Sequence, residues 1–245
     1  MKVQYVSDLH LEFNPNHYID MPGGDVLILA GDVCVAANWD DGYLSFFEQC
    51  VSKYNKVFYV LGNHEFYGSA QFDQVEPFLR AVLPEGVTLL SNQSEYYNGV
   101  HFCGATMWTD FHGNKEEMAH AGQYMNDYRQ CGDFTPERSL QENQNTIEWF
   151  SQCVPTLKKG PIVMISHHAP SVQSVHGRYL ESKAAYSNQL EYFIETHPQI
   201  THWISGHIHH NNDYMIGKCN CLSNPRGYEG MEMNESFNQT FEFEV

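Results

Sequence analysis

Aspartate, asparagine and histidine side chains recur at one kind of position in this chain, directly after an apolar run. The stretch "VSDLHLEF" places Asp8 and His10 two residues apart after the first run. The other residues in such positions are Asp32, Asn63, His64, His167, His207 and His209. Carboxylate and imidazole groups suit divalent manganese, iron or zinc. A single residue of this kind is usually a turn or cap residue, but five runs that end alike predict a metal site.

The apolar runs are typical of β-strands that are covered on both faces. The five runs are residues 2–6, 25–32, 56–63, 161–168 and 202–210. Apolar side chains at helical spacing occur in residues 41–54, 71–83, 139–154 and 187–197. We expect further strands within residues 99–108 and in the tail from residue 214 onward. This alternation predicts an α/β fold, in which loops after the carboxyl ends of strands meet on one edge and bind ligands.

The length of 245 residues and the lack of a linker predict a single domain that spans residues 1–245. The longest segment without a helix or strand pattern runs from about residue 110 to residue 138 and is rich in Gly, His, Asn, Tyr and acidic residues. Long loops in compact domains often carry function, so we expect a cap or a long active-site loop around residues 110–138.

The composition narrows the range of partners. The formal net charge is −17, from 30 acidic and 13 basic residues. Such a surface repels phosphate backbones, so we expect no stable binding to nucleic acid and none to a membrane. The opening residues lack the apolar core of a signal peptide, and seven cysteines show no paired spacing beyond Cys219 and Cys221. These features predict reduced thiols in a cytoplasmic protein, whose oligomeric state stays open.

Five short blocks carry a resemblance to a known family. The blocks "SDLH", "AGDV", "LGNHEF", "SHHAP" and "SGHIHH" occur in this order along most of the chain. Their pattern resembles that of the calcineurin-like metallophosphoesterase superfamily. The resemblance implies a four-layer α-β-β-α sandwich, in which two mixed β-sheets are flanked by helices and a dinuclear metal site lies at the carboxyl ends of the strands. "GNHE" without a G-D-x-x-D-R-G motif resembles the phosphodiesterase-type branch more than the protein serine/threonine phosphatases.

The resemblance also implies a role for each residue of these blocks. The implied metal ligands are Asp8, His10 and His209 for one ion, Asn63, His167 and His207 for a second ion, and Asp32 as the bridge. His64 matches the family's histidine that acts at the leaving group without binding metal. Two cations about 3.5–4 Å apart clamp the attacking and leaving oxygens of a displacement and activate a water. We expect two divalent ions, manganese, iron or zinc, with manganese supporting activity.

Other residues near the blocks have two interpretations each. Glu65 either orients His64 or is an acid favoured at a helix N-terminus. His168 and His210 neighbour the implied ligands, and surface or packing positions are the alternative to lining the site. Arg226 in "SNPRGY" either binds a substrate phosphate through two hydrogen bonds or is an exposed turn residue.

Three more candidates for substrate binding are Asn126, Arg129 and Tyr67. Asn126 and Arg129 belong to the expected cap, with a structural helix start as the alternative. Tyr67 follows the "GNHEF" block and could stack on a base or sugar, although tyrosines are common in this chain.

Together these observations predict a dinuclear metal-dependent phosphoesterase that hydrolyses a small phosphodiester or nucleotide-type substrate by a metal-activated water. A monoester dianion would want cationic side chains beyond the metals, and few of the 13 bases lie near the blocks. A phosphomonoesterase or a protein phosphatase is the alternative. A non-catalytic scaffold on the same fold is disfavoured because every ligand and His64 are present, and a nuclease would want basic grooves or extra domains.

Overall fold

The computed structural model describes residues 1–14 and 18–245, apart from the side chains of Arg178 and Leu180. One sheet is built from β1 (Lys2–Val6), β2 (Gly24–Ala30), β3 (Tyr54–Val60), β4 (Val87–Leu89) and β13 (Glu242–Glu244). The second sheet is built from β5 (Gln93–Tyr97), β6 (Val100–Ala105), β7 (Ile162–Ser166), β8 (Ile200–Ser205), β9 (Asn212–Ile216) and β10 (Cys219–Ser223). A short pair follows, β11 (Gly227–Tyr228) with β12 (Glu232–Met233).

Both sheets are mixed, as predicted. The strand order is β13-β1-β2-β3-β4 in the first sheet and β5-β6-β7-β8-β10-β9 in the second. The central strands of each sheet run parallel, whereas β13, β5 and β9 are antiparallel to their neighbours. The parallel strands point their carboxyl ends the same way, so the loops that follow β1, β2, β3, β7 and β8 emerge on one edge of the molecule.

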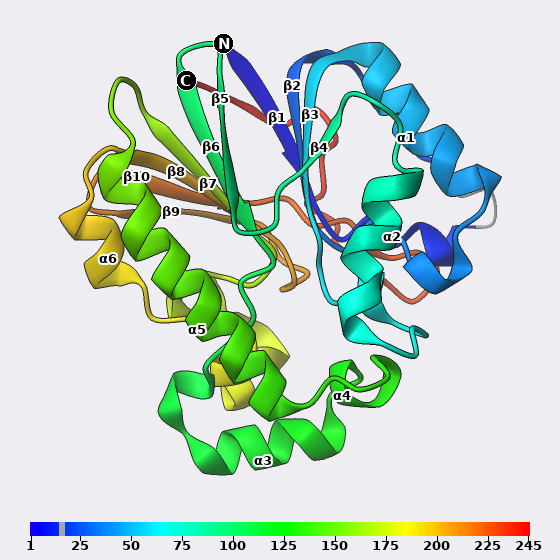
Figure 1. The fold of residues 1–245 in the computed structure, drawn as a ribbon, viewed down its shortest axis with the longest axis vertical. Helices are drawn as coiled ribbons and strands as arrows, with labels where there is room; N and C mark the ends of the chain where they lie inside the picture. Colours follow the sequence, from blue (N-terminus) through cyan, green and yellow to red (C-terminus); the bar gives the residue numbers. More distant parts are fainter. Residues whose placement is uncertain (15–17) are drawn as a thin grey trace.

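The helices lie outside the two sheets (Figure 1). The α-helices are α1 (Asp41–Lys53), α2 (Val75–Val82), α3 (Lys115–Tyr124), α4 (Asp127–Gln130), α5 (Pro136–Cys153) and α6 (Glu191–Thr196). The segments of 3-10 helix are η1 (Leu11–Phe13), η2 (Ala36–Asn38), η3 (His64–Phe66), η4 (Phe72–Gln74), η5 (Phe111–Gly113), η6 (Val154–Thr156), η7 (Val172–Ser174) and η8 (Gly177–Ala185). No described helix is both long and apolar enough to cross a membrane.

Side chains along each central strand alternate between two apolar layers, which explains why the sequence runs are continuously apolar. Ile28 of β2 packs with Val163 of β7 between the sheets. Its neighbour Leu27 faces the opposite way and joins the cluster that contains Phe47 of α1. On the far side, Phe150 of α5 packs against the outer face of the second sheet. The predicted order of helix, sheet, sheet and helix is therefore confirmed.

The five predicted strands and the first three predicted helices are confirmed within a few residues, but two segments differ from expectation. The segment 110–138 is largely helical, because it contains η5, α3, α4 and the start of α5. The side chain of Asn114 caps α3 by accepting hydrogen bonds from the backbone N–H groups of Glu116 and Glu117. The predicted helix 187–197 shortens to α6, because Ser187 forms a β-bridge with Ala169.

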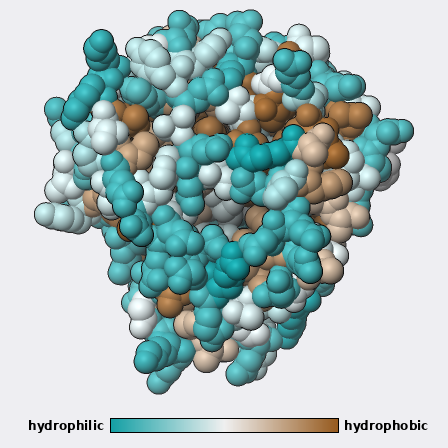
Figure 2. Space-filling model, viewed as in Figure 1, coloured by the Kyte–Doolittle hydropathy of each residue, from teal (hydrophilic) through white to brown (hydrophobic). Residues whose placement is uncertain are grey.

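Helices α3 and α4 form the lower part of the molecule in Figure 1, apart from both sheets. A small apolar cluster of Phe111, Ala121 and Ala185 joins α3 to η8. Hydrophilic side chains cover most of the face seen in Figure 2, including this lower part. The weak apolar pattern of α3 explains why its sequence resembles a loop, since only one narrow side of the helix is packed.

Candidate metal centre

The predicted metal ligands lie on loops that follow strand ends, and several have an unusual backbone. Asp8, His10, Asp32 and His207 have φ angles of 50°, 45°, 54° and 68°. This left-handed region is costly for residues other than glycine, and it persists at functional sites where the surrounding structure enforces it. The four backbones are thus strained at the places where the side chains must turn toward one another.

The glycines of two sequence blocks allow these loops to approach closely. A Cβ atom on Gly62 would lie 2.1 Å from Oδ1 of Asp32 and 2.8 Å from Cε1 of His167. A Cβ atom on Gly31 would lie 2.4 Å from Nδ1 of the same histidine. Only glycine fits at either position, so the G-D and G-N parts of the blocks serve to bring Asp32 and His167 together.

The first predicted ligand set converges in the structure. Asp8, His10 and His209 each direct a ligand atom into a space where these atoms lie within 4.8 Å of one another. Nε2 of His209 is 3.4 Å from Oδ1 of Asp8 and 3.1 Å from Nε2 of His10. Nδ1 of His10 lies 3.1 Å from Oε1 of Glu12, a pairing in which the Nδ1 proton is donated and the Nε2 lone pair faces the other ligands.

The second set converges beside the first. Asp32, His167 and His207 also have ligand atoms within 4.8 Å of one another. Oδ1 of Asn63 lies 2.9 Å from Nε2 of His167 and 3.0 Å from Nδ1 of His207. Nδ1 of His167 is 2.9 Å from the backbone carbonyl of Ala30, which turns Nε2 toward the site.

Asp32 lies between the two sets. Its Oδ2 atom is 3.8 Å from Nε2 of His10 and 3.4 Å from Nε2 of His167. This position is the one that a bridging carboxylate requires, so the geometry agrees with the role that the sequence resemblance implies.

The charges of this cluster fit bound cations. Burial would raise the pKa of Asp32, but His167 and His64 outweigh it and hold that pKa well below its usual range. Burial likewise lowers the pKa of His167, but Asp32 and Asp8 raise it to about 10. Without metal, the buried carboxylates therefore draw a proton onto a histidine. A divalent cation satisfies the same demand, and the oxygen and nitrogen donors are those that manganese, iron and zinc accept.

His64 lies next to the cluster and has its own carboxylate partner. Nδ1 of His64 is 2.7 Å from Oε1 of Glu12, and its backbone N–H donates to Asp32. Burial lowers the pKa of His64, but Asp32 and Glu12 raise it to about 9. Nε2 of His64 lies 3.2 Å from the hydroxyl of Tyr228. The structure thus places one ring nitrogen of His64 on Glu12 and the other at the pocket.

Of the two interpretations of Glu65, the structure agrees with the acid at a helix N-terminus, because Glu65 lies in the first turn of η3. Its buried carboxylate accepts backbone N–H groups of Asp32, Val33 and Gly62 at 3.0, 2.7 and 2.6 Å, and the hydroxyl of Tyr59 donates to it as well. Burial raises the pKa of Glu65 to about 7. Glu65 therefore ties the loops after β2 and β3 together beneath the metal ligands, and Glu12 is the residue that orients His64.

Asn63 is held in place by a residue from the expected cap. Its Nδ2 donates to Oδ1 of Asp127 at 2.8 Å, and the hydroxyl of Tyr67 donates to the same oxygen at 2.6 Å. Burial raises the pKa of Asp127. This anchoring directs Oδ1 of Asn63 at His167 and His207.

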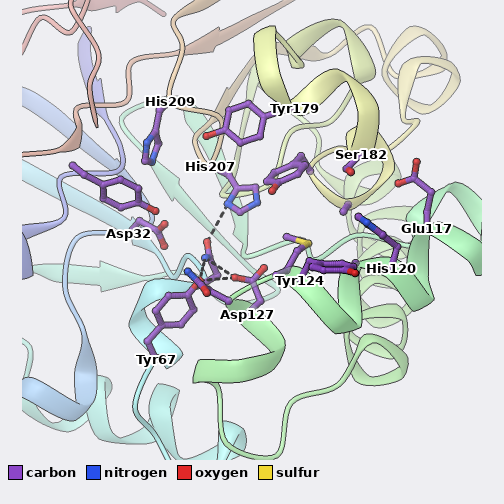
Figure 3. A pocket seen from close by; sticks show the side chains of 17 residues that line it. Asp32, Tyr67, Glu117, His120, Tyr124, Asp127, Tyr179, Ser182, His207 and His209 are labelled. Atoms are coloured by element: carbon purple, nitrogen blue, oxygen red, sulfur yellow. Dashed lines mark hydrogen bonds between the residues drawn. The ribbon is translucent and has the colours of Figure 1, made fainter. Parts of the chain in front are cut away.

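A pocket of about 260 Å³ opens from the metal centre toward α3 and η8; we name it the α3 pocket. Figure 3 shows Asp32 and His209 at one end and Glu117 and His120 at the other. Its lining residues are Asp32, Asn63, Tyr67, Glu117, His120, Ala121, Tyr124, Met125, Asn126, Asp127, Tyr179, Ser182, Ala185, Tyr186, His207, His209 and Tyr228.

A second pocket, of about 540 Å³, lies beside His64 and η1; we name it the His64 pocket. Its lining residues are Glu12, Phe13, Val35, Asn38, His64, Tyr67, Gly68, Asn126, Gln130, Tyr228 and Met231. Tyr67, Asn126 and Tyr228 line both pockets. The two pockets therefore adjoin along these three residues, next to His64 and the ligand cluster.

The four predicted substrate-binding residues divide into two pairs. Tyr67 and Asn126 line both pockets. Arg226 instead pairs with Glu229 at 2.6 Å and donates to the backbone carbonyl of Leu9. Arg129 is exposed and donates to the backbone carbonyl of Gln123. Neither arginine is among the described residues that line the two pockets.

The neighbouring histidines also differ from each other. His168 is buried, its ring lies 4.2 Å from that of His207, and burial lowers its pKa to about 3. His210 is exposed and stacks on His176. The expectation of packing or surface positions holds for both.

Sequence reasoning missed two residues that contact His64. Glu12 stands two positions after His10, so "DLHLE" extends the first block by a carboxylate at the same spacing. The ring of Tyr228 lies 4.3 Å from that of His10 and 4.6 Å from that of His209, and its hydroxyl faces His64. No sequence spacing relates Tyr228 to the five blocks. It belongs to β11, which follows the last block in the chain and folds back over the site.

The fold and this cluster agree with what is found in known proteins. A family model described as calcineurin-like phosphoesterase matches residues 1–211, which include all seven predicted ligands and His64. The chain belongs to the calcineurin-like phosphoesterase family. The predicted family, fold class and assignment as a metallophosphoesterase are therefore confirmed.

Individual relatives are more distant. Phosphopantetheinyl hydrolase from Mycobacterium tuberculosis has a similar structure, with a TM-score of 0.70 and 16% identity over 93% of this chain and 89% of that chain. TT1561 of Thermus thermophilus has a TM-score of 0.53 and 14% identity over 92% and 88% of the two chains. Uncharacterized protein L509 of Acanthamoeba polyphaga mimivirus is 25% identical over 267 residues, which cover 92% of this chain and 91% of that protein. At this level of identity, the similarity to the two solved structures shows a common fold and nothing about substrate.

Replacing Asp32 by Asn should weaken both metal ions together, because its carboxylate lies between the two ligand sets. We expect two manganese ions per chain at saturation, and a loss of affinity of at least about tenfold at each site in the variant. Elemental analysis after dialysis against graded manganese measures both, with the exposed Asp213→Asn as the matched control. One ion per chain that Asp32→Asn leaves in place would contradict the two-metal arrangement.

Replacing Glu12 by Gln should slow turnover at saturating metal, because His64 loses the carboxylate that holds it as an acid. A general acid typically contributes about 10²–10⁴-fold, which sets the ceiling and is the loss expected for His64→Ala. The loss should be larger for alkyl leaving groups than for p-nitrophenol, which needs little protonation. Equal losses for leaving groups of very different pKa would show that Glu12 and His64 only support the structure.

Replacing Glu65 by Gln should destabilise the fold, because an amide nitrogen cannot accept the backbone N–H groups that the carboxylate accepts. We expect the free energy of unfolding to fall by about 3 kcal/mol, as for a buried acceptor with several donors. Urea unfolding of chelator-treated protein measures this without the contribution of bound metal. A loss no larger than that of Glu85→Gln, an exposed site, would refute the structural role.

Proposed function

We propose that this chain is a manganese-dependent phosphodiesterase that acts on a small substrate. The observation that carries this proposal is the pair of adjoining pockets beside one metal centre. A phosphodiester has two ester groups, and the two pockets can hold one each. A monoester would fill only one of them.

The charge near the centre also favours a diester. A monoester dianion carries more negative charge than a diester monoanion and gains more from arginine. The two arginines expected to bind phosphate are occupied elsewhere, Arg226 by Glu229 and Arg129 by a backbone carbonyl. The described lining of both pockets contains carboxylates and tyrosines but neither lysine nor arginine. The cationic contacts to phosphate would come mainly from the metals.

Two divalent cations would supply Lewis-acid charge and a water of lowered pKa at this centre. The chain's own residues position the remaining protons. Glu12 accepts a hydrogen bond from Nδ1 of His64, which fixes the ring and directs its Nε2–H toward the shared boundary of the pockets. In this structure the hydroxyl of Tyr228 lies in that direction. A departing alkoxide at the same place would take the Nε2 proton, so the alcohol leaves as a neutral product.

Two further predictions from the sequence remain proposals. The cytoplasmic location is one of them. It is supported by the seven cysteines, all of them among the described residues, because none of them forms a disulfide. The expectation of no stable nucleic-acid or membrane partner is the other.

Hydrolysis of bis-p-nitrophenyl phosphate should exceed hydrolysis of p-nitrophenyl phosphate, because the diester fills both pockets and needs no arginine. We expect kcat/KM for the diester to be higher by at least about tenfold in the same manganese buffer, which corresponds to about 1.4 kcal/mol. Replacement of manganese by magnesium or zinc in parallel tests the choice of ion. A higher kcat/KM for the monoester, lost in Arg226→Ala, would reverse the proposal and identify Arg226 as a phosphate ligand.

A further inference from the structure

The two pockets have unequal positions relative to the general acid. His64 lines the His64 pocket and is absent from the described lining of the α3 pocket. A general acid must lie within hydrogen-bond reach of the leaving oxygen. The leaving alcohol therefore belongs in the His64 pocket, where Phe13, Val35 and Met231 offer apolar surface. The group that stays on the phosphorus belongs in the α3 pocket.

The α3 pocket is built mainly from aromatic rings and carboxylates. Its tyrosines are Tyr67, Tyr124, Tyr179, Tyr186 and Tyr228. Figure 3 shows Glu117 and Tyr124 on the α3 side and Tyr179 and Ser182 on the facing η8 segment. Beyond the metal ligands, Glu117 and Asp127 contribute the acidic groups of this lining. Among the lining side chains that the structure describes, none is lysine or arginine.

This combination attracts cations. The faces of tyrosine rings bind ammonium groups, and quaternary ammonium is commonly recognised by several aromatic rings together. A carboxylate at the same place adds direct charge attraction, which is stronger in a partly enclosed pocket than in open water. The same lining repels further phosphate groups, so a nucleoside polyphosphate is a poor match for it. A net charge of −17 over the chain favours approach of a positively charged group as well.

We propose that the α3 pocket binds an alkylammonium group, such as choline, on the retained arm of a zwitterionic phosphodiester. Glu117 and Tyr124 hold the cation at the outer end. The phosphate reaches the metal centre at the inner end, where Tyr67 and Tyr228 pack on histidine rings. The outer position suits a short, compact head group, because the whole pocket measures about 260 Å³. This inference rests on the proposed diesterase activity and adds the chemical class of one substrate arm.

Two diesters with a common leaving group separate this recognition from the chemistry. The p-nitrophenyl ester of phosphorylcholine carries the cation, and the 3,3-dimethylbutyl p-nitrophenyl diester is its neutral isostere. We expect kcat/KM for the choline ester to exceed that of the isostere by roughly 5- to 30-fold, the range of a partly desolvated cation–π site. A thymidine p-nitrophenyl diester tests a flat neutral base in the same pocket.

Variants locate the effect. Glu117→Gln and Tyr124→Ala should each bring the ratio of choline ester to isostere toward one. Glu116→Gln is the matched control, because Glu116 is exposed on the same helix and does not line the pocket. Its ratio should equal that of the unchanged protein.

The inference is overturned if the unchanged protein hydrolyses both diesters equally, if Glu117→Gln leaves the ratio intact, or if the thymidine ester is preferred to both. Failure to hydrolyse any diester would refute the proposed function instead. In that case, binding of tetramethylammonium to the manganese-free protein, measured by NMR, tests whether the α3 pocket binds a cation independently of catalysis. Chemical-shift changes at α3 residues support the inference if Glu117→Gln lowers the affinity for tetramethylammonium at least about fivefold. Absence of binding refutes it.

Discussion

The carboxylates of Asp8 and Asp32 are buried where the strand ends of the two sheets meet, and the surrounding structure must balance their negative charge. Burying an ionised carboxylate is costly unless it is paired or binds a metal. Histidines from both sheets surround these carboxylates, and the pKa of His167 rises to about 10 as a result. Metal binding is the function that this arrangement serves, because a pair of divalent cations would balance the same charge and leave the histidines neutral.

The loops that carry the ligands must approach one another closely, and this requirement constrains the backbone around them. The backbones of four predicted ligands adopt left-handed conformations, and Gly31 and Gly62 leave no room for a Cβ atom beside His167. Glu65 holds the loops after β2 and β3 from below through their backbone N–H groups. Stability and function are thus joined at this edge, because the loops that carry the ligands donate backbone hydrogen bonds to a carboxylate that is not itself a predicted ligand.

Much of this arrangement is predictable from the sequence, because each ligand follows an apolar strand and carries a distinctive neighbour. The two-layer packing of the strands also follows from their continuous apolar runs. Glu12 and Tyr228 were not predicted, since their roles depend on where a side chain points and on which loop folds over the site. The helix α3 could not be predicted from the sequence. A polar helix that packs along one narrow side shows almost no helical periodicity in its apolar residues. The turn around Arg226 suits a phosphate ligand in the sequence, but in the structure its guanidinium pairs with Glu229, three residues later.

Under the proposed function, the two pockets would give the metal site its substrate preference. The ligand cluster and His64 would carry out the hydrolysis, whereas α3 and η8 would supply the outer surface for one substrate arm. The two segments contact each other through a small apolar cluster that lies apart from the main cores. If α3 and η8 contact the substrate as proposed, we expect substitutions there to change substrate preference without disturbing the strands that hold the predicted metal ligands.

The most direct test of the central claim is anomalous diffraction at the manganese absorption edge from crystals of this protein grown with manganese. The structure predicts two peaks per chain, one beside Asp8, His10 and His209 and one beside Asn63, His167 and His207, with Asp32 in contact with both. A single peak, or peaks away from Asp32, would contradict the claim that this edge of the two sheets is built to hold two ions.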